Sequence, residues 1–145
     1  MKSIVSAMLL SLISISAWSQ AKVPVYLIGS HGEQDNLGQR LAFELKEQIL
    51  TSARFRLVED EKSWPYLKVY IITVVGGEAG LSTAVNYTIV FDSKEQPLRG
   101  ALIAGGVRFC GRNRVTDCAR DLLPTIDRAV DSLQKEAPSL WSALR

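Results

Sequence analysis

The stretch VRFCGRNRVTDCA, residues 107–119, marks the point where this chain changes from a strand pattern to a helix pattern. It contains both cysteines, Cys110 and Cys118, with seven residues between them. A redox Cys-x-x-Cys motif has two intervening residues, and a structural zinc site needs about four ligands, which two cysteines and a distant histidine do not supply. We therefore expect no metal or cofactor, and one intrachain disulfide that ties the strand to the first turn of the helix. The less favoured alternatives are a redox or regulatory role, free thiols and intermolecular pairing.

The first residues have the pattern of an export signal. Lys2 is followed by an apolar run, and Ala17 and Ser19 place small residues at positions −3 and −1 of a cleavage site. We expect residues 1–19 to be removed, with cleavage after Ala21 as the alternative. The apolar run is too short and too rich in serine to span a membrane, and no cysteine stands near the cleavage point to carry a lipid. An uncleaved membrane anchor is the less favoured alternative.

Export to an oxidising compartment agrees with the expected disulfide, so the sequence predicts a periplasmic or secreted protein without a membrane anchor after cleavage. Residues 20–145 have the length of one domain and contain no repeat or linker. The formal net charge of the whole chain is +2, which gives no reason to expect a nucleic-acid partner. The oligomeric state is left open.

Hydrophobic periodicity predicts strands and helices in the order β-α-β-β-β-β-α. The strands are Val23–Gly29, Phe55–Val58, Tyr66–Val75, Ser82–Asp92 and Leu98–Phe109, and the helices run from about Leu37 to Ser52 and from Val115 to Ala137. The expected helix caps are Asp35 or Asn36, then Asn113 or Thr116. Pro124 should kink or divide the second helix. The tail, Ser139 to Arg145, is expected to pack back on the domain.

This order predicts an α+β fold, a two-layer sandwich with a mixed sheet of about five strands. A β-α-β unit at the start permits parallel pairing across the helix, and the later strands, joined by short loops, should form an antiparallel meander. Two amphipathic helices cover one face of such a sheet only. The alternation of apolar and polar residues in Ser82–Asp92 agrees with an uncovered opposite face.

The search for catalytic groups finds little. His31 is the only histidine, both cysteines are expected to be oxidised, and there is no G-x-S-x-G elbow. The acidic residues Glu33, Asp35 and Glu59–Glu61 are typical of caps and charged turns, and the glycine loop Gly76–Gly80 lacks a phosphate-binding pattern. We therefore expect no enzymatic activity. The alternative is a small exported hydrolase that uses the loop around His31.

Two groups of side chains are candidates for binding a partner. The first is Arg108, Arg112 and Arg114, because a loop fixed by a disulfide and carrying guanidinium groups suits recognition of carboxylates or phosphates. The alternative is that these arginines are solvated or paired with local acids. The second is Tyr66 and Tyr70, which with Trp64 are expected near one another on the uncovered face, where exposed aromatic side chains mark contact sites.

A signal segment followed by this element order resembles the small envelope domains of the TolB N-terminal, LpoB and CsgG type. The stretch Cys110-Gly111 … Asp117-Cys118-Ala119 is also similar to a set of exported proteobacterial proteins with a C-terminal cysteine pair. The first resemblance implies protein–protein contacts in the cell envelope. We therefore expect a non-catalytic domain that binds an envelope protein. The remaining alternative is a secreted inhibitor of a hydrolase, with the disulfide loop as its protruding element.

Overall fold

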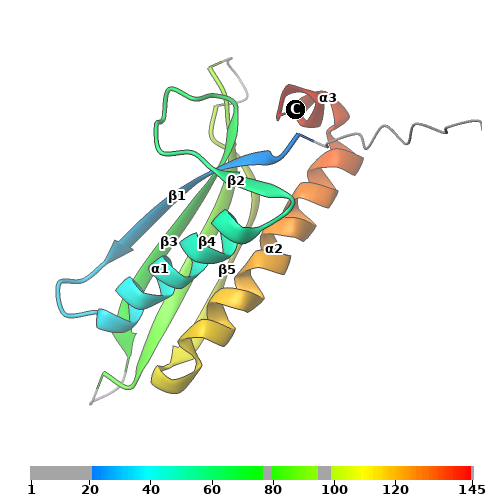
Figure 1. The fold of residues 1–145 in the computed structure, drawn as a ribbon. Coiled ribbons are helices and arrows are strands. Elements are labelled where there is room, and N and C mark those ends of the chain that lie inside the picture. Colours follow the sequence, from blue (N-terminus) through cyan, green and yellow to red (C-terminus); the bar gives the residue numbers. More distant parts are fainter. Residues whose placement is uncertain (1–20, 77–79, 95–98, 145) are drawn as a thin grey trace, which may run out of the picture.

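The computed structural model describes residues 21–76, 80–94 and 99–144, so the predicted signal segment lies outside the described residues. The elements are β1 (Val23–His31), α1 (Asn36–Thr51), β2 (Phe55–Leu57), β3 (Tyr66–Gly76), β4 (Ser82–Asp92), β5 (Ala101–Gly111), a 3-10 turn (Arg112–Arg114), α2 (Val115–Glu136) and α3 (Pro138–Leu144). The predicted α+β fold, with its five strands and two long helices in that order, is confirmed (Figure 1). The expected tail forms the short helix α3.

The sheet has the strand order β2-β1-β3-β4-β5. β1 pairs in parallel with β2 and with β3, whereas β3, β4 and β5 form an antiparallel meander. The meander therefore excludes β2, and β1 lies between β2 and β3. β2 and β3 can lie on opposite sides of β1 without a second crossover helix because β2 is short. Leu57 at the end of β2 and Leu67 at the start of β3 both lie opposite Val25. The connecting chain therefore only has to pass from one side of β1 to the other.

The core lies between the sheet and the helices α1 and α2, which pack on the same face (Figure 1). Alternate residues of the central strands, among them Val69 and Ile89, are almost fully buried there. The helices supply the apolar residues Leu41, Leu45, Ile49, Leu122, Ile126, Val130 and Leu133. In α3, Leu144 is buried, and Leu140 and Trp141 pack against the same core, as expected for the tail.

α2 continues through Pro124 as one helix, so of the two predicted outcomes the division into two segments is wrong, and the kink stays a prediction. Proline lacks the N–H that would bond to the carbonyl four residues earlier, but it leaves the rest of the helical ladder intact. The residues after Pro124 bury Ile126, Val130 and Leu133 against the core, and this packing holds the helix together. No helix in the described part of the chain is long and apolar enough to cross a membrane.

Candidate interaction surface

The face of the sheet turned away from the helices exposes several large apolar side chains. In the strand register, Ile72 and Val107 flank Asn86, and in the next row Val74 and Phe109 flank Ala84. The exposed fractions are 49% for Ile72, 63% for Val74, 61% for Val107 and 78% for Phe109. We call these four side chains the open-face patch. Single exposed apolar residues are ordinary, but a contiguous group on one face marks an interaction site.

The open-face patch borders the end of the sheet where β5 leads into α2. Here the predicted disulfide between Cys110 and Cys118 is confirmed, with 6.1 Å between the two Cα atoms. The turn enclosed by the disulfide is also held by a hydrogen bond of 2.7 Å from the Arg112 N–H to the Leu81 carbonyl oxygen. The predicted caps Asn113 and Thr116 are wrong: α2 follows the 3-10 turn without a side-chain cap.

Arg108 is engaged within the protein rather than presented to solvent. Its Nη2 donates to Thr125 Oγ1 at 2.9 Å, and its Nη1 donates to the Asp121 carbonyl oxygen at 3.4 Å. The guanidinium carbon also lies 5.7 Å from the centroid of the Tyr87 ring. The same tyrosine explains the glycine at position 106, where an added Cβ would lie 2.7 Å from the Tyr87 hydroxyl oxygen. These contacts tie β5 to α2.

Of the three predicted arginines, Arg108 and Arg114 line one hollow and Arg112 lines another, so the structure brings only Arg108 and Arg114 together. Arg112 borders a hollow whose other lining residues include Asp35 and Gly80. Arg114 shares a hollow with Phe109, a member of the open-face patch. Arg114 Nε lies 3.7 Å from the Asp117 carboxylate, and both side chains are well exposed. Such an ion pair is weak, so Arg114 is available to another carboxylate.

The predicted tyrosines lie toward the opposite end of the same face, near the start of β3. Tyr66 is fully buried, and its hydroxyl accepts a hydrogen bond of 2.8 Å from the Trp64 indole N–H. Tyr70 is half-buried and lies between Tyr66 and the patch along β3. A partner on this part of the face would therefore meet Tyr70 rather than Tyr66. The part of both residues in binding stays a prediction.

Lys68 fills the space between these rings. Its Nζ lies 5.7 Å from the Tyr70 centroid and 5.9 Å from those of Tyr26 and Tyr66. Nζ is also 2.9 Å from the Asp92 carboxylate, and the two side chains are only 12% and 7% exposed. Burial alone would lower the pKa of Lys68, but the Asp92 carboxylate outweighs it and raises the pKa above its usual value. This cation is therefore neutralised inside the protein.

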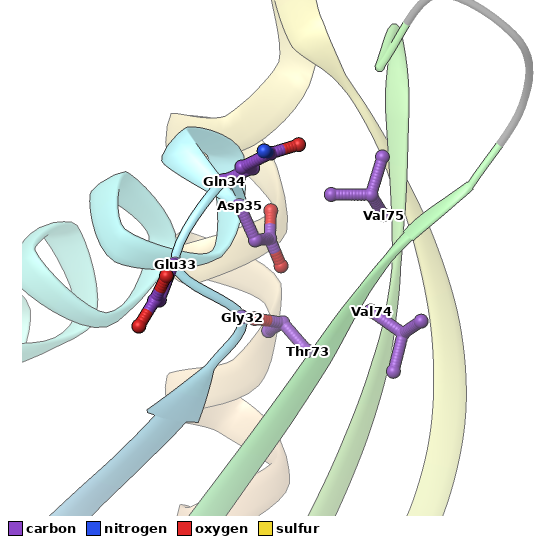
Figure 2. A pocket seen from close by; sticks show the side chains of 7 residues that line it. All are labelled: Gly32, Glu33, Gln34, Asp35, Thr73, Val74 and Val75. Atoms are coloured by element: carbon purple, nitrogen blue, oxygen red, sulfur yellow. The ribbon is translucent and has the colours of Figure 1, made fainter.

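A separate hollow lies where β1 leads into α1 (Figure 2). It has a volume of about 450 Å³ and lies between the loop Gly32–Asp35 and the end of β3. Figure 2 shows the Asp35 carboxylate directed toward Thr73, while Glu33 points away. Asp35 is the predicted cap of α1, and this is confirmed: its Oδ1 accepts from the Gly38 N–H at 2.8 Å, and its Oδ2 accepts from the Thr83 hydroxyl at 3.1 Å.

The ionisation of Asp35 is set by opposing influences. Burial raises the pKa of the carboxyl, but the adjacent Thr73 hydroxyl, the Gly38 N–H, the Thr83 hydroxyl and the positive potential of His31 together lower it below its usual value. The Thr73 hydroxyl lies against the carboxylate without a hydrogen bond of standard geometry. The two well-formed hydrogen bonds, from the Gly38 N–H and the Thr83 hydroxyl, stabilise the ionised carboxylate. The ionised carboxylate serves the helix cap.

His31 is exposed at the end of β1, directly opposite Thr73 of β3 in the strand register. Within residues 21–76, 80–94 and 99–144, no hydrogen bond joins its imidazole to a serine, threonine or acidic side chain. The described residues thus show no nucleophile–base pair built on His31. The same residues contain no group of three or more histidine, cysteine or acidic side chains placed to hold a metal ion.

The residues that sequence reasoning missed are the exposed apolar ones. Ile72 and Val74 alternate with core residues of β3, which was a signal that they lie on the uncovered face. Val107 and Phe109 gave no such signal, because Gly105 and Gly106 interrupt the alternation of β5.

No family model matches the sequence, and no curated protein is similar to it. The solved structures that the chain matches include the following two. A PelC dodecamer from Paraburkholderia phytofirmans is 12% identical, with a TM-score of 0.41 over 68% of this chain and 80% of that chain. A minor lipoprotein from Acinetobacter baumannii is also 12% identical, with a TM-score of 0.39 over 74% of this chain and 94% of that chain. Similarities of this size carry no inference about function.

Proposed function

We propose that this chain is a non-catalytic binding domain of the cell envelope that recognises a protein partner through the open-face patch. The observation that supports this is the exposure of Ile72, Val74, Val107 and Phe109 together on the face turned away from α1 and α2. Each large apolar side chain contributes about 1.5–3 kcal/mol when it moves from water to a fully buried site. A partner that covers the patch recovers part of this free energy.

The two arginines of the turn that follows β5 define the chemistry of that partner. Arg114 borders Phe109, and its ion pair with Asp117 is exposed. Arg112 makes no ion pair within the described residues. Protein interfaces combine an apolar centre with a polar rim, and arginine is enriched in them. The partner we propose therefore presents an apolar strip bordered by carboxylates, which meet the two arginines.

Capture experiments with matched variants test the proposal. Immobilised protein would be mixed with envelope extract, and the amount of each captured protein compared between the parent, Val74→Asp and Phe43→Asp. Phe43 is 62% exposed on α1, close to the 63% of Val74, and it lies on the helix layer away from the patch. We expect Val74→Asp to weaken capture about 10-fold or more, because one buried apolar contact is worth at least about 1.4 kcal/mol.

Phe43→Asp should bind like the parent, and both variants should keep the parent melting temperature, because both positions are exposed. Arg112→Ala and Arg114→Ala should each weaken capture by a smaller factor, about 3-fold, as expected for charges at the rim. Equal capture by Val74→Asp and by the parent would refute the proposal. If the captured protein is a hydrolase that loses activity on binding, the inhibitor alternative is the better description.

A further inference from the structure

β5 is an edge strand of the sheet, and no described strand covers its outer side. The strand has 11 residues, Ala101–Gly111, whereas the other edge strand, β2, has three. Proteins usually block long edges with lysine, proline or a covering segment. β5 contains no lysine or proline, and its one charged side chain, Arg108, is turned toward α2.

The hydrogen-bond pattern shows which residues turn their backbone groups outward. In an antiparallel pair, alternate residues direct both N–H and C=O toward the neighbouring strand. The Arg112 N–H donates to the Leu81 carbonyl oxygen, so Arg108 and Cys110 share this inward direction toward β4. Val107 and Phe109 have the opposite direction. Their N–H and C=O groups point away from the sheet, available to another strand.

We infer that a second copy of this chain pairs with β5 in antiparallel fashion, centred on Val107, to form one continuous sheet across a twofold axis. In this register the partner's Gly105 lies opposite Phe109, so the exposed ring covers a position without a side chain. Arg108 lies opposite the partner's Gly106. Moving the centre to Arg108 would instead place this arginine against its own copy, and like charges directly opposite are destabilising. Charge therefore disfavours that neighbouring register, and the placement of Phe109 opposite Gly105 favours the register centred on Val107.

The size of the contact sets its strength. Phe109 and Val107 are 78% and 61% exposed, and an aromatic side chain buries about 150–250 Å². Pairing through one strand edge with these side chains buries less surface than the roughly 800 Å² per partner that a stable interface buries. The pairing is therefore concentration-dependent. Because a joined sheet leaves the open face uncovered, the inference does not depend on the proposed function.

Cysteine substitution tests the register in the full exported protein, with its native disulfide in place. In the inferred pairing, position 107 faces its own copy, with Cα atoms about 5.5 Å apart, which lies within the range of a disulfide. Position 109 lies four residues from its own copy along the strand, about 14 Å away. Under mild oxidation, Val107→Cys should form a covalent dimer at least 10-fold faster than Phe109→Cys or the exposed control Val74→Cys.

Sedimentation of the protein without added cysteines provides a second readout. The parent should shift from monomer to dimer as its concentration rises. Val107→Pro removes an outward N–H and leaves the β4 ladder intact, and Val107→Lys places a charge on the edge; both should remain monomeric. Val74→Asp should still dimerise, which separates this inference from the partner-binding proposal. A parent that stays monomeric, a folded Val107 variant that still dimerises, or equal cross-linking at 74, 107 and 109 would overturn the inference.

Discussion

At the scale of single residues, the buried charges of this protein serve its structure. Lys68 is enclosed by tyrosine rings and paired with Asp92, and Arg108 joins β5 to α2 through Thr125. Asp35 is 1% exposed and caps α1 while it also accepts a hydrogen bond from β4. Buried charges of this kind are costly to leave unpaired. Their pairing supports the interpretation that the contact surface lies elsewhere, on the apolar open face.

Asp35→Asn should produce a pH-dependent loss of stability. The pKa of Asp35 in the folded protein is lowered from its usual 3.8, so ionisation stabilises the fold. This contribution is fully present above the unfolded-state pKa and is lost as the pH falls through the folded-state pKa. Asparagine caps helices about as well as aspartate, so the substitution removes mainly the charge. Urea unfolding should therefore show a lower free energy of unfolding for Asp35→Asn than for the parent at pH 7, and this difference should shrink below about pH 4.

Asp35→Ala is the control for the cap itself. Its free energy of unfolding should be lower than that of Asp35→Asn by about a further 1 kcal/mol, which is typical of a lost N-cap. This further loss should persist at low pH. A difference between the parent and Asp35→Asn that stays constant from pH 7 to pH 3 would contradict the assigned role of the charge.

At the scale of secondary-structure elements, the connection between β5 and α2 positions both the arginines and the edge of the open face. The disulfide holds the end of the strand against the first turn of the helix, and Arg108 makes a second link further along β5. Phe109 lies between these two fixed points. A side chain held in place before a partner arrives loses less conformational entropy on binding.

Cys118→Ser should lower the free energy of unfolding, because the disulfide no longer restricts the unfolded chain. The expected loss is about 2–3 kcal/mol, the size that corresponds to the short loop that the disulfide closes. Cys118 is the better position to replace, since Cys110 is 1% exposed and a buried hydroxyl there would add its own cost. The parent in reducing agent should lose a similar amount, while the variant should not respond to the reductant. Denaturant unfolding measures both. Equal stability of the parent with and without reductant would show that the disulfide has no structural role.

The elements themselves were predictable from sequence, because the alternation in β4 and the apolar stripes of the two long helices are regular. What was not predictable depends on contacts between distant segments. The burial of Tyr66 requires the hydrogen bond from Trp64, and the engagement of Arg108 requires the relative placement of β5 and α2. The position of β1 between β2 and β3 follows from the shortness of β2, which periodicity does not reveal.

At the scale of the whole molecule, the helices protect one face of the sheet, and the described residues leave the other face and one long edge accessible. The face and the edge meet at β5, where Val107 and Phe109 contribute to both. Pairing of two copies through the edge would therefore place two open-face patches in one continuous surface. Avidity then favours a partner that carries two matching sites, as long as its geometry lets both be occupied together.

Export should remove the first residues without disturbing this fold. The first described residues already contact the domain: Lys22 Nζ donates to the Ser52 carbonyl oxygen at 2.8 Å, and the Val23 N–H donates to the Arg54 carbonyl oxygen at 2.8 Å. Both predicted cleavage points precede these contacts. Intact-mass measurement of the exported protein should therefore find Gln20 or Lys22 as the first residue.

Two substitutions distinguish the cleavage points, because processing requires small residues at positions −3 and −1. Ala17→Asp places a charge at −3 of the site after Ser19 and should block that cleavage only. Ala21→Asp places a charge at −1 of the site after Ala21 and should leave the site after Ser19 in use. A variant with both substitutions should keep its signal segment, and its mass should match the uncut chain. Exported parent protein that retains Met1 would show that residues 1–19 are an anchor rather than a removable signal.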